Sequence, residues 1–208
     1  MTAPPAFTDA AETWNRRYAG DEFLFGTEPN AWLRQHASAL PPGGRILSVA
    51  DGEGRNSVWL ARQGFQVDAF DVADRAVVKA QAFTQREGVS VNFTVADVDG
   101  FHWPDAAYDG VAAIFVQFAD PATRARLFER IVRSLKPGGV LILQGYTPKQ
   151  LEYRTGGPPI LSHLYTRELL EAAFTNLTII ELREYEAEVQ EGQGHSGRSA
   201  LIGLVARR

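Results

Sequence analysis

The 208-residue sequence contains no cysteine, and it has no apolar run of the roughly 20 residues that a membrane helix needs. Without cysteine, disulfides, cysteine-ligated zinc and thiol nucleophiles are excluded, and we expect no metal site. The sequence also has no block of basic residues, and its 21 Lys and Arg against 25 Asp and Glu give a net charge of −4. A nucleic-acid partner normally requires a basic stripe, so we expect neither a nucleic-acid nor a membrane partner. The N-terminus shows no signal peptide, which predicts a cytoplasmic protein.

Length and composition indicate one α/β domain covering residues 1–208. Hydrophobic residues make up 45% of the chain, as is usual for a soluble α/β protein. Within the domain we expect an N-terminal helical lid over residues 1–44 and a cofactor-binding core over residues 45–145. A loop, a helix and a C-terminal hairpin then occupy residues 146–208. The sequence leaves the oligomeric state open.

The most informative segment is an apolar strand that begins at Ile46 and runs into a glycine turn containing Gly52 and Gly54. A helical pattern follows the turn, and a second apolar strand over residues 65–70 ends on Asp71. Glycines let the backbone turn sharply and approach a ligand, and a carboxylate at the next strand end accepts hydrogen bonds from ribose hydroxyls. The segment therefore predicts a site for an adenosine-containing cofactor.

The turn alone does not choose between cofactors, since dinucleotide-binding dehydrogenases use G-x-G-x-x-G there. In this chain Ser57 stands in the place of the third glycine. The later pattern is more specific: a strand over residues 91–95 leads to Asp97, and a long apolar strand over residues 108–116 begins Tyr-Asp. A helix over residues 122–135 then leads to the Lys-Pro-Gly-Gly turn and a fifth strand over residues 140–144.

As a set, these motifs resemble the class I S-adenosylmethionine-dependent methyltransferases over nearly the whole chain. The resemblance implies a doubly wound, Rossmann-like sheet of seven mostly parallel strands with helices on both faces, and S-adenosyl-L-methionine as cofactor. Residues 177–189 and 199–206 read as two strands of a hairpin, so the last strand is expected to be the one antiparallel strand.

The resemblance also implies cofactor contacts. Asp71 is expected to accept from the ribose hydroxyls, and Asp97 and the Val98 N–H to meet the adenine, although Asp97 also fits a capping role. The family usually places an acid and a first glycine where this chain has Ser48 and Ala50, so Asp51 or Glu53 are candidates for the missing charge. The expected cofactor-binding residues are Trp14, Tyr18, Ala50, Gly52, Glu53, Gly54, Asn56, Asp71, Val72, Asp97, Val98, Phe115 and Gln117.

The N-terminal Trp-Asn-Arg-Arg-Tyr segment and the Gly54-Arg55-Asn56 sequence look like the tellurite-resistance and thiopurine methyltransferase branch. That likeness implies a small-molecule acceptor such as a thiol or a chalcogen oxyanion. His195 and Arg198, near the last hairpin turn, are the predicted catalytic residues: histidine exchanges protons near neutral pH and arginine clamps oxyanions. Two alternatives are an inactive or sensory cofactor-binding homologue and an NAD-dependent oxidoreductase.

Overall fold

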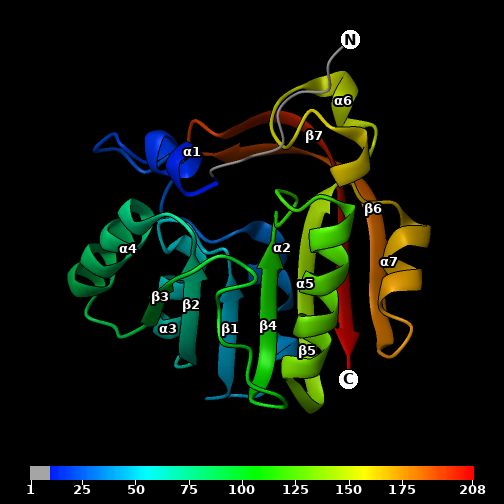
Figure 1. The fold of residues 1–208 in the computed structure, drawn as a ribbon, viewed down its shortest axis with the longest axis horizontal. Helices are drawn as coiled ribbons and strands as arrows, with labels where there is room; N and C mark the ends of the chain where they lie inside the picture. The colour runs from blue at the N-terminus through cyan, green and yellow to red at the C-terminus, as the bar shows by residue number, and fades with distance from the viewer. Residues whose placement is uncertain (1–9) are drawn as a thin grey trace.

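A computed structural model describes residues 10–208, and its centre is a seven-stranded sheet in the order β3-β2-β1-β4-β5-β7-β6 (Figure 1). The strands are β1 (Arg45–Val49), β2 (Gln66–Asp71), β3 (Asn92–Val95), β4 (Tyr108–Ile114), β5 (Leu135–Tyr146), β6 (Thr178–Glu191) and β7 (His195–Arg207). Strand β7 pairs antiparallel with both β5 and β6, and the pairs among β1 to β5 are parallel. The predicted fold class is confirmed.

Helices lie on both faces of the sheet (Figure 1). They are α1 (Ala10–Arg17), α2 (Ala31–His36), α3 (Arg55–Arg62), α4 (Asp74–Glu87), α5 (Pro121–Ser134), α6 (Gln150–Tyr153) and α7 (Arg167–Ala173), with short 3₁₀ turns at Ala37–Ala39 and Leu161–His163. Among the described residues, no helix is long and apolar enough to cross a membrane.

Successive side chains of a strand point to opposite faces, and this alternation builds two cores. On β5, Leu141 and Leu143 pack into the core under α5 and α7, while Val140 and Ile142 pack into the core under α2 and α3. Both faces of the central strands are therefore buried, which explains why these strands are continuous apolar runs rather than alternating ones.

The C-terminal hairpin is longer than the sequence pattern suggested. Strands β6 and β7 remain paired up to Glu191 and His195, which lie directly opposite each other. Only residues 192–194 form the turn, with Gly192 at a φ of 59°. His195 is thus the first residue of a strand and not part of a loop. Because only three residues form the turn, Glu191 and His195 are brought opposite each other.

Candidate active site

The glycine turn lies at the carboxyl end of β1, the edge where parallel α/β sheets bind ligands. Asp71, at the end of β2, accepts hydrogen bonds from the backbone N–H groups of Gly52 (2.9 Å) and Ala73 (2.9 Å). Each carboxylate oxygen has a second lone pair, so both remain able to accept from a ligand hydroxyl. Burial raises the pKa of Asp71, although these backbone donors oppose the rise.

A second carboxylate, Asp51, is held inside the turn itself. It accepts from the Ser48 hydroxyl at 2.6 Å, from the Ser57 backbone N–H at 3.3 Å and from the Ser57 hydroxyl. Burial raises the pKa of Asp51 to about 6, against the lowering effect of these donors. Ser48, which stands where the resembling family has an acid, therefore supports an acid three residues later.

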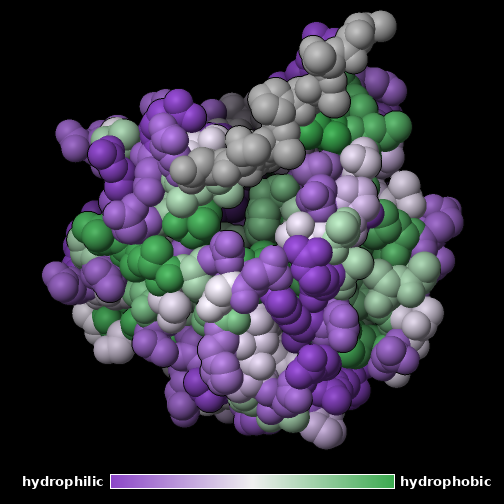
Figure 2. All heavy atoms as spheres, in the orientation of Figure 1, coloured by the Kyte–Doolittle hydropathy of each residue, from purple (hydrophilic) through white to green (hydrophobic). Residues whose placement is uncertain are grey.

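A cavity of about 140 Å³ opens beside the turn. Its lining includes the carboxylates Asp51, Asp71 and Asp97, together with Val98 and aromatic residues such as Trp14. Asp97 accepts from the Gly100 N–H at 2.6 Å within a turn, and no helix begins there. Figure 2 shows a hollow on this face of the molecule, with hydrophobic residues in its wall.

Two non-glycine residues of the cavity wall have left-handed backbones. Ala50 has a φ of 48° and Phe115 a φ of 56°, a region that side chains with a Cβ rarely adopt. The Phe115 N–H donates to Gln144 at 2.8 Å, and its ring stacks on Tyr146 with a centroid distance of 4.6 Å. Such conformations cost of order 1–3 kcal/mol each and concentrate at functional sites.

Residues from α1 to Asn30 cover the turn from above. A Cβ added to Gly52 would lie 2.9 Å from the Tyr18 hydroxyl, so only glycine permits this approach. Glu53 accepts from the Leu24 N–H at 2.7 Å and pairs with Lys79 at 2.5 Å, which attaches the covering segment to α4. The covering segment is therefore tied to the glycine turn by specific polar contacts.

A second cavity, of about 220 Å³, adjoins the first and shares Trp14, Phe25, Phe115, Phe118 and His195 with it. The remaining lining residues are Thr13, Arg17, Gln117, Tyr146, Gly156, Gly157, Pro158, Pro159, Ile160 and Gly194. Its wall is mainly aromatic and apolar, with His195 and Arg17 as its basic side chains. The Arg17 guanidinium lies 4.4 Å from the Trp14 ring centroid, a cation–π arrangement.

His195 stands at the junction of the two cavities and is 8% exposed. Its ring contacts Phe25 and Phe115, with centroid distances of 4.5 and 4.7 Å. Its Nδ1 lies 3.1 Å from Glu191 Oε2. Burial lowers the pKa of His195, although the carboxylate of Glu191 opposes this.

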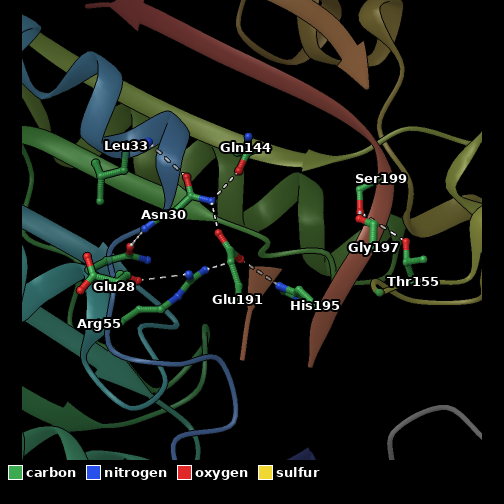
Figure 3. A network of polar contacts seen from close by, with 12 residues as sticks. Glu28, Asn30, Leu33, Arg55, Gln144, Thr155, Glu191, His195, Gly197 and Ser199 are labelled. Carbon is green, nitrogen blue, oxygen red and sulfur yellow. Dashed lines mark hydrogen bonds and ion pairs between the residues drawn. The ribbon is translucent and has the colours of Figure 1, made fainter. Parts of the chain in front are cut away.

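Glu191 joins three distant segments (Figure 3). Besides His195, it accepts from Arg55 Nη2 at 2.8 Å and from Asn30 Nδ2 at 3.0 Å. Asn30 also caps α2 by accepting from the Leu33 N–H at 3.1 Å. Burial would raise the pKa of Glu191, but the hydrogen bond with His195 and the charge of Arg55 lower it to about 2.

Arg198, the other predicted catalytic residue, lies outside both cavities. Its guanidinium is exposed and pairs with Glu186 at 2.6 Å on the neighbouring strand. The structure therefore does not bring Arg198 together with His195. Arg17, which sequence reasoning did not select, is the arginine beside the second cavity.

The structure brings most of the expected cofactor residues to one cavity. Those lining the first cavity are Trp14, Tyr18, Ala50, Gly52, Asn56, Asp71, Val72, Asp97, Val98 and Phe115. Gln117 lines the second cavity, and Glu53 and Gly54 line neither. Gly54 serves packing instead, because a Cβ there would lie 2.9 Å from the Ala80 Cβ. Of the residues not selected from sequence, Phe25, Arg55 and Phe118 also line the first cavity.

Comparison with known proteins agrees with this arrangement. Residues 46–139 match the family model described as a methyltransferase domain. A thiopurine S-methyltransferase of Legionella pneumophila is 27% identical, over 88% of this chain and 88% of its own length. A ubiquinone biosynthesis O-methyltransferase of Paramagnetospirillum magneticum is 35% identical, over 65% of this chain and 59% of its own.

Among solved structures, the N-methyltransferase NodS of Bradyrhizobium japonicum, in complex with S-adenosyl-L-homocysteine, superposes with a TM-score of 0.68. It is 18% identical, and the match covers 95% of this chain and 97% of that one, which is a likeness of fold. Together with the cavity at the glycine turn, the sequence matches support a class I S-adenosylmethionine-dependent methyltransferase, with the methyltransferase-domain match lying within residues 46–139.

The cavity chemistry fits that cofactor. An adenosyl group requires carboxylate acceptors for its ribose and an apolar slot for its base. Asp71 and the slot bordered by Phe70, Val72 and Val98 offer both. The methionine end carries an ammonium group, and Asp51 in the glycine turn is a buried carboxylate that lines the same cavity. NAD is disfavoured because Ser57, in place of the third glycine, hydrogen bonds to Asp51 within the turn.

Proposed function

We propose that the chain transfers a methyl group to a small molecule bound in the second cavity, with His195 accepting the acceptor's proton. The observation that carries the proposal is the wall shared by the two cavities, in which His195 borders both. When bound, S-adenosylmethionine supplies a methyl group on a sulfonium, and this leaving group departs neutral and needs no acid. The work left to the protein is alignment, exclusion of water and removal of a proton.

Within the proposal, Asp71 holds the ribose hydroxyls and Asp51 faces the ammonium end. The Val98 N–H and its apolar neighbours receive the base, and Trp14, Tyr18 and Phe25 exclude water from above. These rings are held in place by mutual stacking, with 5.7 Å between the Trp14 and Tyr18 centroids.

The acceptor chemistry follows from the second cavity. Its aromatic and apolar wall suits a thiol or another compact, weakly solvated nucleophile, which a neutral histidine can deprotonate. The relatives' names include an S-methyltransferase, an O-methyltransferase and an N-methyltransferase, so they favour no single acceptor atom. Among the charged groups of the described lining, Arg17 is the one that would receive an oxyanion.

The test is methyl transfer by the purified chain from S-adenosylmethionine across a panel of alkyl and aryl thiols, phenols, selenite and tellurite. We expect transfer to thiols, and we expect His195→Asn to remove most of it while S-adenosylhomocysteine still binds. His36→Asn is the matched control, because His36 pairs with Glu181 away from both cavities. If His195→Asn transferred methyl groups at the wild-type rate to every acceptor class, the proposal would be overturned.

A further inference from the structure

The hairpin turn before His195 is anchored by one acid, Glu191, whose side chain is 12% exposed and lines neither cavity. Glu191 is absent from the lining of both cavities, yet its carboxylate receives three donors from three segments: Asn30, Arg55 and His195. A buried carboxylate costs free energy unless it is fully paired. Simple support of a two-stranded turn does not require this arrangement, since backbone hydrogen bonds already pair β6 with β7.

The hydrogen bond at Nδ1 decides which nitrogen of His195 is free. An ionised carboxylate only accepts, so the neutral imidazole must carry its proton on Nδ1 and donate it to Glu191. Nε2 then holds the lone pair. No hydrogen bond within the described part of the chain involves Nε2, and the ring borders both cavities.

We propose that Glu191 is a positioning residue that fixes His195 as the Nδ1–H tautomer and stabilises the imidazolium formed when Nε2 takes the acceptor's proton. This inference rests on the proposed function. In the step, the acceptor's X–H bond breaks, its proton bonds to Nε2, and the electron pair left on X forms the new bond to the methyl carbon. The carbon–sulfur bond of the cofactor breaks with its pair remaining on sulfur.

Arg55 completes the arrangement because it balances the charge of Glu191. Arg55 is the first residue of α3, directly after the glycine turn, and its guanidinium also lies 3.5 Å from the Glu28 carbonyl. The charged groups that face His195 are Glu191 on β6, Arg55 on α3 and Arg17 on α1, with the protonated Tyr146 on β5. With His195 neutral, the charges of Glu191 and Arg55 cancel, and Arg17 is the remaining charge that faces the ring.

The test begins with the wild-type protein. Nitrogen-15 NMR of the His195 ring, assigned by comparison with His195→Asn, is expected to show the Nδ1–H tautomer at neutral pH. A ring protonated mainly at Nε2 would overturn the proposal. This measurement needs no acceptor, so it decides the role of Glu191 even if the wild type methylates nothing in the panel, a result that would instead remove the proposed function.

The second measurement compares Glu191→Gln with the matched variant Glu181→Gln. Glu181 lies on β6, as Glu191 does, and it also pairs with a histidine: its Oε2 lies 3.0 Å from Nε2 of His36 on α2. This pair lines neither cavity. We expect Glu191→Gln to lower kcat about tenfold and to move both the His195 titration and the acid limb of the pH–rate profile to lower pH. The direction follows because loss of the carboxylate removes the group that favours imidazolium. Glu181→Gln is expected to change neither.

Glu191→Asp keeps the charge with a shorter reach and is expected to fall between wild type and Glu191→Gln in both readouts. It also serves if Glu191→Gln fails to fold. S-adenosylhomocysteine calorimetry confirms that each variant retains the cofactor site. A fall in kcat without any movement of the His195 titration or the pH profile would show that Glu191 only supports the hairpin, and would overturn the proposal.

Discussion

The two walls that enclose the paired cavities are assembled in different ways. In the cofactor wall, the polar contacts join residues close in sequence: Asp51 meets Ser48 three residues away and Ser57 six residues away, and Asp71 meets Gly52 at a separation of 19. Behind His195, which borders the acceptor cavity, Glu191 meets Arg55 at a separation of 136 residues and Asn30 at 161. The first set of contacts forms within one strand–turn–helix–strand unit, and the second joins segments that are far apart in the sequence.

This difference separates binding from chemistry. The local unit contains the carboxylates that suit an adenosyl cofactor, so changes there should affect cofactor affinity. The long-range wall contains His195 and the apolar acceptor cavity, so changes there should affect the rate of transfer. The predictions below test this division, beginning with the largest expected effect.

His195→Asn should lower kcat by about 100-fold, because a positioned general base contributes roughly that factor or more. Affinity for S-adenosylhomocysteine should change little. Steady-state kinetics at saturating cofactor, together with calorimetry, measure the two quantities separately. An equal loss in both would show that His195 belongs to the cofactor wall and would break the comparison.

Asp71→Ala should weaken S-adenosylhomocysteine binding by roughly 10- to 150-fold, since a hydrogen bond to a charged acceptor is worth about 1.5–3 kcal/mol. The matched control is Asp68→Ala on the same strand, where the carboxylate pairs with Arg45 at 2.6 Å and lines neither cavity. Wild-type affinity in Asp71→Ala, measured by calorimetry, would contradict the ribose assignment.

Binding of S-adenosylhomocysteine should strengthen by up to about tenfold between pH 5 and pH 7. Burial raises the pKa of Asp51 to about 6, and a ligand ammonium group binds the ionised carboxylate better. The affinity therefore rises as Asp51 loses its proton with increasing pH. Asp51→Asn should flatten the dependence; an unchanged slope in that variant would assign it to another group.

Arg17→Ala should raise the KM of an anionic acceptor by about a few-fold, as expected for an exposed charge, and should leave the KM of a neutral thiol unchanged. Arg198→Ala should change neither, because its guanidinium is paired with Glu186 outside the cavities. A selective effect of Arg198→Ala on selenite or tellurite would restore Arg198 as an acceptor contact. Comparing the two variants therefore shows whether Arg17 or Arg198 contacts an anionic acceptor.

The same division explains what the sequence reveals. Strand-end acids and glycine turns are local signals, so the fold, the glycine turn and the position of Asp71 follow from short motifs. Glu191 leaves no such signal, because its partners Asn30 and Arg55 come together only in the folded chain. The sequence pattern predicts that the first hairpin strand ends at residue 189. In the structure this strand continues to Glu191, and the turn at residues 192–194 places Glu191 opposite His195.

Arg198 shows the limit of reading a site from proximity in sequence. It lies three residues after His195, and alternation along β7 turns it to the other side of the strand. There it meets Glu186 of the neighbouring strand instead of the cavity. The arginine that lines the second cavity, Arg17, comes from α1, which no C-terminal motif identifies. Glu53 is likewise predicted to contact the cofactor because it lies in the glycine turn, but its carboxylate pairs with Lys79.

Single-turnover methyl transfer to a thiol at increasing S-adenosylmethionine, in wild type, Asp71→Ala and His195→Asn, tests the separation of binding from chemistry most directly. The account predicts that Asp71→Ala needs more cofactor but approaches the wild-type rate at saturation, whereas His195→Asn saturates at the wild-type concentration with a rate about 100-fold lower. A slow plateau for Asp71→Ala, or a wild-type plateau for His195→Asn, would contradict it.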